Sequence, residues 1–264
     1  MIKVIGIPFD GNSSFLKGPA LAPPRIRLME TGGSANSFCE NGVNILNGKV
    51  YTDLGDMSFA NSNPEEVYTK IKAKIRQELE TECKIICFGG DHSISFPIIE
   101  SSADKFKDLN VLHLDAHADL YDHFDNNPYS HASPFARLME KNIIRSLTQA
   151  GIRTLNSHQK EQAAKFGVTV IEMKDFDNDF IKTLQGPLYV SIDLDVLDPA
   201  FAPGVSHHEP GGMTSRELIK IIQNISVQIV GADIVEYNPT RDINNMTAMA
   251  AYKLFKELVY KMLD

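Results

Sequence analysis

Short apolar runs alternate along this chain with longer stretches of helical periodicity. This alternation is typical of a mainly parallel sheet that helices cover on both faces. The apolar runs predict strands at residues 3–8, 84–90, 110–116, 146–152, 167–172, 187–193 and 227–236. The helical patterns lie at 64–80, 93–103, 132–143, 157–166, 214–224 and 246–262. The fifth of these begins with TSRE, which is the sequence of a capping box, and the polar stretch 31–48 is expected to form a surface loop.

Composition narrows the class of protein. With 264 residues and 43% hydrophobic content, the chain is expected to form one α/β domain over residues 1–264. Its 26 basic and 34 acidic residues give a net charge of −8, which argues against nucleic acid or an anionic membrane as a partner and favours a small cationic molecule. The three cysteines form no CxxC motif, and no apolar run approaches the roughly 20 residues that span a bilayer. We therefore expect a soluble, cytoplasmic protein.

Acidic and imidazole side chains follow four of the predicted strands. These residues are Asp91, His92, Asp115, His117, Asp119, Asp193, Asp195, Asp198 and Glu236. In open parallel sheets, ligands gather beyond the carboxyl ends of the strands. We therefore expect the nine side chains to lie at one edge of the sheet.

The stretch HLDAHADLYD carries Asp115, His117 and Asp119 at every second position. In an extended chain these side chains point to the same side. Alone, the stretch fits either a solvated loop or one edge of a metal site. Buried carboxylates need a compensating cation, and the stretch contains neither Lys nor Arg. Together with the other strand ends it favours a metal site, and a set of carboxylates and imidazoles without cysteine suits Mn²⁺ or another divalent first-row ion. So many carboxylates favour two ions, an arrangement that activates water for hydrolysis.

Four motifs give the chain a resemblance to the ureohydrolase family of arginases and agmatinases. They are GGDHS (89–93), DAHAD (115–119), SIDLDVLDPAFAPG (191–204) and EPGG (209–212). The similarity covers nearly the whole chain and is strongest to the branch of plant-type arginases and bacterial agmatinases. It implies a three-layer α/β/α fold of the arginase–deacetylase type, a binuclear manganese site at the carboxyl edge of the sheet, and a homo-oligomer of three or six subunits.

The resemblance also implies roles for individual residues. One Mn²⁺ would be held by His92, Asp115, Asp119 and Asp193, and the other by Asp115, His117, Asp193 and Asp195, so that Asp115 and Asp193 bridge the ions. Asp91 and His113 would support these ligands. His131 matches the histidine that shuttles protons, and Glu236 matches the glutamate that holds the substrate guanidinium. From the residues alone, His131 also fits a helix-entry position, and Glu236 an ion pair with Arg241.

The resemblance implies hydrolysis of a guanidino compound to urea and an amine. Water activated by the ions would attack the guanidinium carbon, with Asp119 orienting the water and His131 relaying a proton to the departing amine. A non-catalytic, metal-dependent sensor of guanidino ligands and an amide hydrolase are the alternatives. Release of urea distinguishes the first reaction from both.

The loops beyond the strand ends favour agmatine, which would be cleaved to putrescine and urea, over arginine, which would give ornithine and urea. They carry Asp122, Asp125, His207, His208 and Glu209, and they lack Lys and Arg between residues 108 and 136 and between 183 and 215. An unpaired substrate carboxylate is costly to bury, so this rim suits a cationic tail. Neutral donors on the same loops leave arginine, or another guanidino compound, as the alternative.

Overall fold

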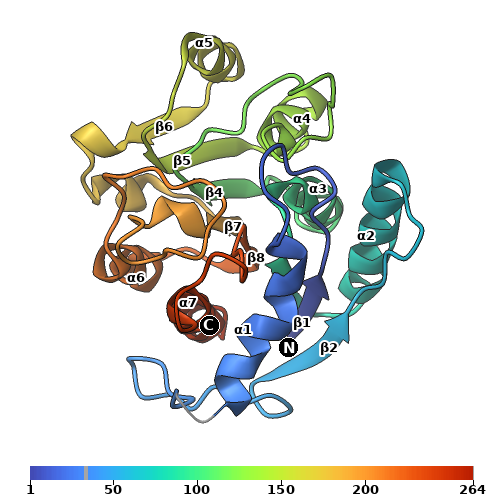
Figure 1. Ribbon diagram of the computed structural model, residues 1–264, viewed down its shortest axis with the longest axis vertical. Helices are drawn as coiled ribbons and strands as arrows, with labels where there is room; N and C mark the ends of the chain where they lie inside the picture. Colours follow the sequence, from blue (N-terminus) through green and yellow to red (C-terminus); the bar gives the residue numbers. More distant parts are fainter. Residues whose placement is uncertain (33–34, 264) are drawn as a thin grey trace.

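One eight-stranded sheet runs through the computed structural model of the chain, which describes residues 1–32 and 35–263 (Figure 1). Its strands are β1 (Ile2–Ile7), β2 (Tyr51–Asp56), β3 (Lys84–Gly89), β4 (Asn110–Leu114), β5 (Ser146–Ile152), β6 (Thr169–Glu172), β7 (Leu188–Asp193) and β8 (Ile229–Val235). The strands lie in the order β2-β1-β3-β8-β7-β4-β5-β6, and each recorded pairing between them is parallel. The prediction of a mainly parallel sheet is confirmed.

Helices form a layer on each face of this sheet (Figure 1). They are α1 (Ala22–Thr31), α2 (Pro64–Leu79), α3 (Ser95–Lys105), α4 (Pro134–Lys141), α5 (Ser157–Phe166), α6 (Ser215–Asn224) and α7 (Met246–Lys261). The apolar sides of α1, α6 and α7 pack in one hydrophobic cluster, and those of α2 to α5 pack in a second cluster on the opposite face. The three-layer α/β/α architecture is therefore confirmed. No helix in residues 1–32 and 35–263 has the length and apolar character needed to cross a membrane.

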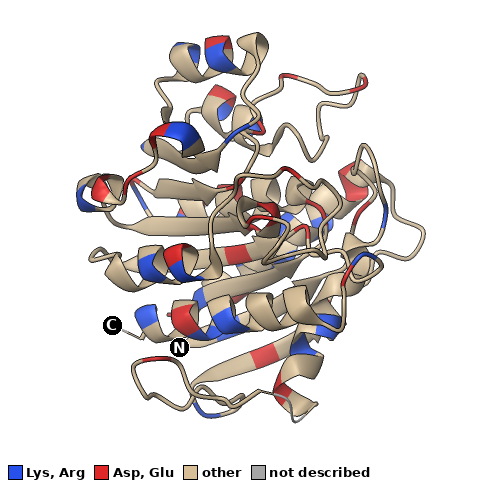
Figure 2. Ribbon diagram, turned by 60° about the vertical axis from the view of Figure 1, so that its left-hand side comes forward, with Lys and Arg blue, Asp and Glu red and all other residues tan. Residues whose placement is uncertain are grey.

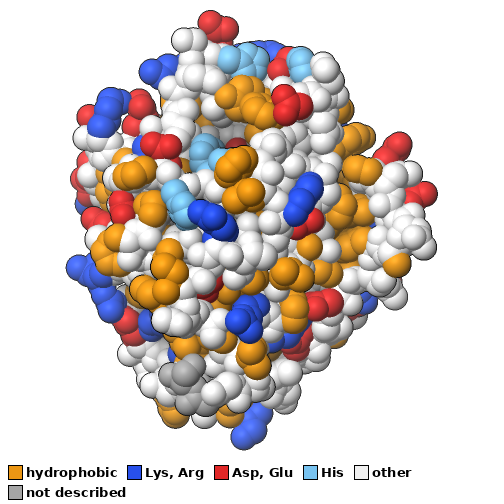
Figure 3. All heavy atoms as spheres, in the orientation of Figure 1, with side chains coloured by type: hydrophobic (Ala, Val, Ile, Leu, Met, Phe, Trp, Pro, Cys, Tyr) orange, Lys and Arg blue, Asp and Glu red, His pale blue; other side chains and the backbone are white. Residues whose placement is uncertain are grey.

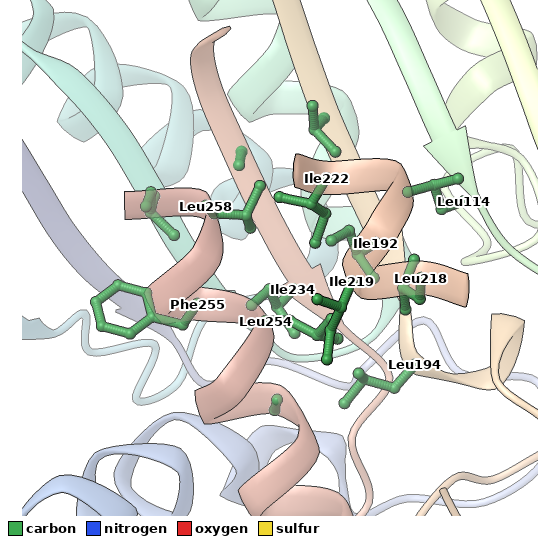
Figure 4. Close-up of a cluster of buried hydrophobic side chains, with 14 of the residues drawn as sticks. Leu114, Ile192, Leu194, Leu218, Ile219, Ile222, Ile234, Leu254, Phe255 and Leu258 are labelled. Atoms are coloured by element: carbon green, nitrogen blue, oxygen red, sulfur yellow. The ribbon is translucent and has the colours of Figure 1, made fainter. Parts of the chain in front are cut away.

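The core on the first face shows how the helical period builds a layer. Leu254 and Leu258 of α7 are four residues apart and point toward α6, where Leu258 lies beside Ile222, and Leu218 extends the same cluster on the other side of α6 (Figure 4). Beneath these helices, Ile234 of β8 continues the cluster into the sheet (Figure 4). All five side chains are at most 2% exposed. This packing fixes both helices against the strands that lead to the acidic edge.

One α-helix and one strand lie outside the predicted elements. Helix α1 begins with two prolines, Pro23 and Pro24, which suggest a loop in the sequence but are well tolerated in the first turn of a helix. Strand β2 is polar and largely exposed because it pairs only with β1 at the edge of the sheet. The expected loop at 31–48 is irregular beyond Thr31, the last residue of α1, with residues 33 and 34 outside the described range.

The strand order brings the four chemically marked strand ends together. Strands β3, β8, β7 and β4 are consecutive neighbours in the sheet although other elements separate them in the sequence. The sheet continues beyond these four strands with β1 and β2 on the β3 side and with β5 and β6 on the β4 side. Figure 2 shows acidic residues (red) on the loops beyond one end of the strands. Ligand sites of parallel α/β sheets lie at such an edge.

The capping box predicted for TSRE is present at the start of α6. Thr214 accepts a hydrogen bond from the backbone N–H of Glu217, and Glu217 accepts one from the backbone N–H of Thr214 at 2.8 Å. Replacing Thr214 with Ala removes one of these bonds and should lower the free energy of unfolding by about 1 kcal/mol. Chemical denaturation measures the difference. The control Ser215→Ala lies outside the box and should change stability far less, so an equal loss in both variants would contradict this role for the cap.

Candidate active site

A buried histidine stands among three carboxylates at the acidic edge. His92 follows β3 in a short 3₁₀ helix (His92–Ile94), and its Nδ1 lies 3.1 Å from Asp115 Oδ2 and 3.2 Å from Asp119 Oδ2. Asp193, the last residue of β7, places its Oδ2 3.3 Å from the same nitrogen. This Nδ1 has no hydrogen-bond partner among the described residues. The four side chains are the ones that the sequence assigns to one ion.

A second group of donors adjoins the first. His117 Nδ1 lies 3.0 Å from Asp195 Oδ2 and 3.4 Å from Asp115 Oδ1. Asp115 therefore contributes one carboxylate oxygen to each group. Asp195 is held by the backbone N–H of Ala116, which donates to its Oδ1 at 3.1 Å. All six side chains that the sequence predicts as metal ligands are thus brought together.

The electrostatics of these groups indicate that cations belong between them. Burial, together with the negative charges of Asp195 and Asp115, raises the pKa of the Asp193 carboxyl well above its usual range. Burial lowers the pKa of His92, but its contacts with Asp115, Asp119 and Asp193 outweigh that effect and raise it. Several buried carboxylates at close range are costly unless cations neutralise them. The unpartnered His92 Nδ1 and the mixture of oxygen and nitrogen donors fit divalent metal ions.

Groups behind the ligands hold them in place. His92 Nε2 lies 3.0 Å from Ser191 Oγ, which donates to Asp233 at 2.6 Å. His113 Nε2 lies 2.7 Å from Asp115 Oδ2, and Gln149 Nε2 lies 2.9 Å from the other ring nitrogen of His113. Such partners orient metal ligands. His113 lies close enough to its neighbours to be a ligand itself, but its bond to Asp115 fits the predicted supporting role.

Sequence reasoning did not single out Ser191, Asp233 or Gln149. The signal for Ser191 is its position two residues before Asp193 on the same strand, which turns both side chains to the same face. Gln149 is the direct neighbour of His113 in the pairing of β4 with β5. Asp233 is likewise the neighbour of Ser191 across β7 and β8. These two signals become visible only when the strand pairing is known.

The loop after β3 approaches β1 too closely for a side chain at one position. A Cβ added to Gly90 would lie 2.1 Å from the carbonyl oxygen of Phe9. Glycine is therefore required there, and its contact with Phe9 sets the direction in which the chain delivers Asp91 and His92. Asp91 accepts hydrogen bonds from Asn12 N at 2.9 Å and Ser93 N at 3.1 Å. These bonds hold the turn that carries His92, while the support of the ligands expected of Asp91 stays a prediction.

Glu236 and His131 form a pair beside the ligand groups. His131 Nδ1 lies 2.8 Å from Glu236 Oε1, which also accepts a hydrogen bond from the backbone N–H of His92 at 2.9 Å. The second carboxylate oxygen, Oε2, has no hydrogen-bond partner among the described residues. Glu236 has a φ of 61°, a strained conformation for a residue with a side chain. Its partner is His131, whereas the alternative considered from the sequence was an ion pair with Arg241.

A pocket of about 250 Å³ opens over both groups. Its lining includes Asp119, Asp193, Asp195, His117, His131, His207, Glu236, Ser14, Tyr121, Phe124, Ala132, Thr154 and Gln159. Figure 3 shows histidine side chains (pale blue) beside a hollow on this face of the molecule. The described lining contains neither Lys nor Arg. The pocket therefore offers acidic groups at its base and mostly neutral groups on its walls.

The loop that follows Asp119 faces the pocket with only some of its side chains. Tyr121 lines it and stacks on His158 with ring centroids 5.5 Å apart. His123 and Asp125 are exposed, and Tyr129 packs against Tyr68 away from the pocket. Only part of the loop thus faces the site.

Two residues brace the rim on the other side. Asp198 caps a turn, as its DP sequence allows, by accepting hydrogen bonds from the backbone N–H groups of Ala200 and Gly211. Arg153, which sequence reasoning missed, donates to the carbonyl oxygens of Asp195 and Glu209, both at 2.6 Å. It thereby ties the loop that carries a ligand to the rim. An isolated arginine after a strand gives no sequence signal for such a role.

Comparison with known proteins accounts for this arrangement. The model of the Arginase family matches residues 1–260. The chain belongs to the arginase family. It is a ureohydrolase and carries the residues of a binuclear metal site. The family resemblance and the fold expected from the sequence are both confirmed.

The similar proteins include enzymes with two different names. Arginase 1, mitochondrial, from Arabidopsis thaliana is 44% identical over 275 residues, covering 98% of this chain and 80% of that one. An agmatinase from Bacillus cereus is 31% identical over 264 residues, with 98% and 90% covered. The structure of arginase from Medicago truncatula superimposes with a TM-score of 0.93 at 41% identity, covering 99% of this chain and 87% of that one. Within the arginase family, the chain is thus more similar to these plant arginases than to the agmatinase.

Proposed function

We propose that this ureohydrolase cleaves arginine to ornithine and urea with two manganese ions. The observation that supports a guanidino substrate is that Oε2 of the buried Glu236 has no hydrogen-bond partner among the described residues. Glu236 lines the pocket beside the six proposed ligands. A planar guanidinium pairs well with a carboxylate. Arginine is favoured as the substrate because identity to the plant arginase exceeds identity to the agmatinase, 44% against 31%.

This proposal replaces the preference for agmatine drawn from the loop sequences. That preference assumed that a site without Lys or Arg would reject a substrate carboxylate. The pocket wall carries Tyr121 and Gln159, whose hydroxyl and amide groups can donate hydrogen bonds to a carboxylate. Neutral donors can therefore compensate part of its desolvation, and the absence of a cation does not decide between the substrates.

The residues proposed to hold the ions are the six predicted from the sequence. They are His92, Asp115, His117, Asp119, Asp193 and Asp195. Carboxylate and imidazole donors without thiolates suit Mn²⁺. When bound, two such ions supply Lewis-acid activation of water at neutral pH and neutralise the buried carboxylates. A homo-oligomer and a cytoplasmic location stay predictions from the sequence.

The remaining roles belong to side chains of the pocket. Glu236 holds the guanidinium through Oε2 while its Oε1 stays bound to His131 and to the backbone of His92. Asp119 accepts a hydrogen bond from the attacking water and so directs it at the guanidinium carbon. His131 then delivers a proton to the departing amine. Burial lowers the pKa of His131, but its hydrogen bond to Glu236 and the charge of that carboxylate raise it overall to about 9, so that the ring can carry this proton at neutral pH.

Steady-state kinetics with arginine and agmatine test the choice of substrate. We expect urea release from the manganese-loaded protein with a kcat/KM for arginine at least roughly 100-fold above that for agmatine, because donors built to hold the carboxylate are left unpaired by agmatine. A higher kcat/KM for agmatine would overturn the arginase proposal and leave the family unaffected. Guanidino binding without urea release would instead favour a sensor, and hydrolysis of an amide without urea would favour an amide hydrolase.

A further inference from the structure

The imidazole ring of His131 is held from two sides. On one side its Nδ1 meets Glu236, as described above. On the other, its Nε2 lies 2.8 Å from the hydroxyl oxygen of Ser14 and 3.2 Å from the backbone nitrogen of Ser14. Ser14 also lines the pocket. It lies 117 residues before His131, so this contact exists only in the folded chain.

The segment that carries Ser14 is anchored without the help of the serine hydroxyl. Asn12 donates its backbone N–H to Asp91 and its side-chain amide to Ser93 Oγ at 3.1 Å. The carbonyl oxygen of Asn12 accepts a hydrogen bond from the backbone N–H of His131 at 3.3 Å. Removing the Ser14 hydroxyl should therefore leave the backbone of residues 12–14 in place.

The backbone N–H and the hydroxyl of Ser14 are compatible with different protonation states of the His131 ring. A backbone N–H can only donate, so its approach to Nε2 requires a lone pair on that nitrogen. A neutral imidazole has one protonated and one unprotonated nitrogen, and its proton must then lie on Nδ1, where it is donated to Glu236. A hydroxyl can rotate and either donate or accept. It is therefore the group of Ser14 that can stay bonded when Nε2 becomes protonated.

Resting on the proposed function, we propose that Ser14 is a positioning residue for His131. Its backbone N–H fixes the neutral ring with the proton on Nδ1, and its hydroxyl accepts a hydrogen bond from Nε2–H in the protonated ring. Protonation of His131 breaks one O–H bond of the attacking water, whose oxygen bonds to the guanidinium carbon, and forms one N–H bond at Nε2. Delivery breaks that bond at Nε2 and forms an N–H bond on the departing amine nitrogen as its bond to the guanidinium carbon breaks. Ser14 gains and loses no proton in either step.

The charged groups around His131 stay unchanged when only this hydroxyl is removed. Glu236, Asp91 and Asp119 act on the ring from the ends of β8, β3 and β4, and His207 lies with its ring centroid 5.7 Å away. A change in the titration of His131 in such a variant therefore reports the loss of the hydroxyl. The protonated ring loses its acceptor, so its pKa should fall.

The test compares Ser14→Ala, Ser14→Thr and Ser13→Ala by the pH dependence of kcat for arginine. Ser14→Ala should lower kcat roughly tenfold and move the alkaline limb of the profile down by about one pH unit, because it removes a hydrogen bond to a charged group. KM should change little, and Ser14→Thr should restore most of kcat because it retains a hydroxyl. Ser13→Ala removes the neighbouring hydroxyl, which contacts Asp91 Oδ2 at 3.4 Å rather than the ring, and should leave the alkaline limb where it is in the wild type. An unshifted alkaline limb in Ser14→Ala would overturn the proposal.

A second measurement separates this proposal from the proposed function. If the wild-type protein released no urea from arginine, the function would fail, but the ring of His131 could still be examined. Nitrogen NMR of the protein loaded with diamagnetic Zn²⁺, recorded above pH 9 where the ring is neutral, distinguishes the two neutral tautomers of the imidazole. A neutral ring protonated at Nδ1 would support the role of Ser14, and one protonated at Nε2 would overturn it.

Discussion

Replacing Asp115 with Asn is expected to remove bound metal and nearly all activity. Asp115 places one carboxylate oxygen 3.1 Å from His92 Nδ1 and the other 3.4 Å from His117 Nδ1, so it serves both groups of ligands. An amide has only one oxygen and no charge, and cannot replace a carboxylate between two cations. We expect kcat to fall by at least roughly 10³-fold, the scale on which loss of a metal-activated nucleophile acts. Asp193→Asn should behave alike.

Elemental analysis of the purified variants measures the metal directly. The wild type should bind two equivalents of Mn²⁺ per chain, and Asp115→Asn fewer than one. Asp125→Asn is the matched control, because Asp125 is exposed and has a φ of 50°, a conformation that asparagine also adopts readily. It should keep both equivalents. Two full equivalents in Asp115→Asn would remove Asp115 from the bridging position.

Replacing His131 with Ala should leave both metal equivalents in place but lower kcat by about 10²- to 10⁴-fold, the range typical of general acid–base groups. His131 contacts Glu236 and Ser14 and is not among the proposed metal ligands. The loss should be partly restored by added imidazole, since a free ring can occupy the space of the deleted side chain. Metal analysis and kcat across the pH range test both parts.

An exposed histidine on the same loop supplies the control for this variant. His123→Ala removes a ring that contacts Asp122 at the surface and should leave kcat unchanged. If His131→Ala kept the wild-type kcat at every pH, His131 would have no part in proton transfer. If it lost metal as well, it would belong with the ligands.

The stability of the folded protein also depends on the His131 pair. The pKa of this histidine rises from the usual 6.5 to about 9 in the fold, as burial is outweighed by the contact with Glu236. A raised folded-state pKa means that the native state binds the proton more tightly than the unfolded chain. This contribution to stability is present in full below pH 6.5 and is lost as the pH rises through about 9. The same proton is the one proposed to reach the departing amine.

The sequence by itself determined which side chains leave the ends of the strands. Apolar runs that end in Gly or Asp mark the strands, because a parallel strand buried on both faces needs continuous apolar residues. Alternation along the chain then placed Asp115, His117 and Asp119 on one side. The capping box at Thr214 was equally readable, since its two hydrogen bonds lie within four residues. The strand ends and the capping box depend on neighbours in the sequence and are present in the structure. Strand β4 ends at Leu114, however, so Asp115, His117 and Asp119 converge from the loop that follows it and not by alternation along a strand.

Only the tertiary structure decided which residues from distant parts of the chain contact one another at the site. Nothing local specifies that β8 and β7 lie between β3 and β4, yet this order puts Glu236 beside His131, 105 residues away. The contact of Ser14 with His131 and the hydrogen bond from Arg153 to the carbonyl oxygen of Asp195 also join residues that are far apart in the sequence. Helix α1 and strand β2 also depend on their packing in the fold. Their own residues gave no clear signal, because α1 has prolines in its first turn and β2 is a polar edge strand. Local preferences are weak compared with the free energy of burying apolar surface between layers, so the site is completed by contacts that the sequence encodes only through the whole fold.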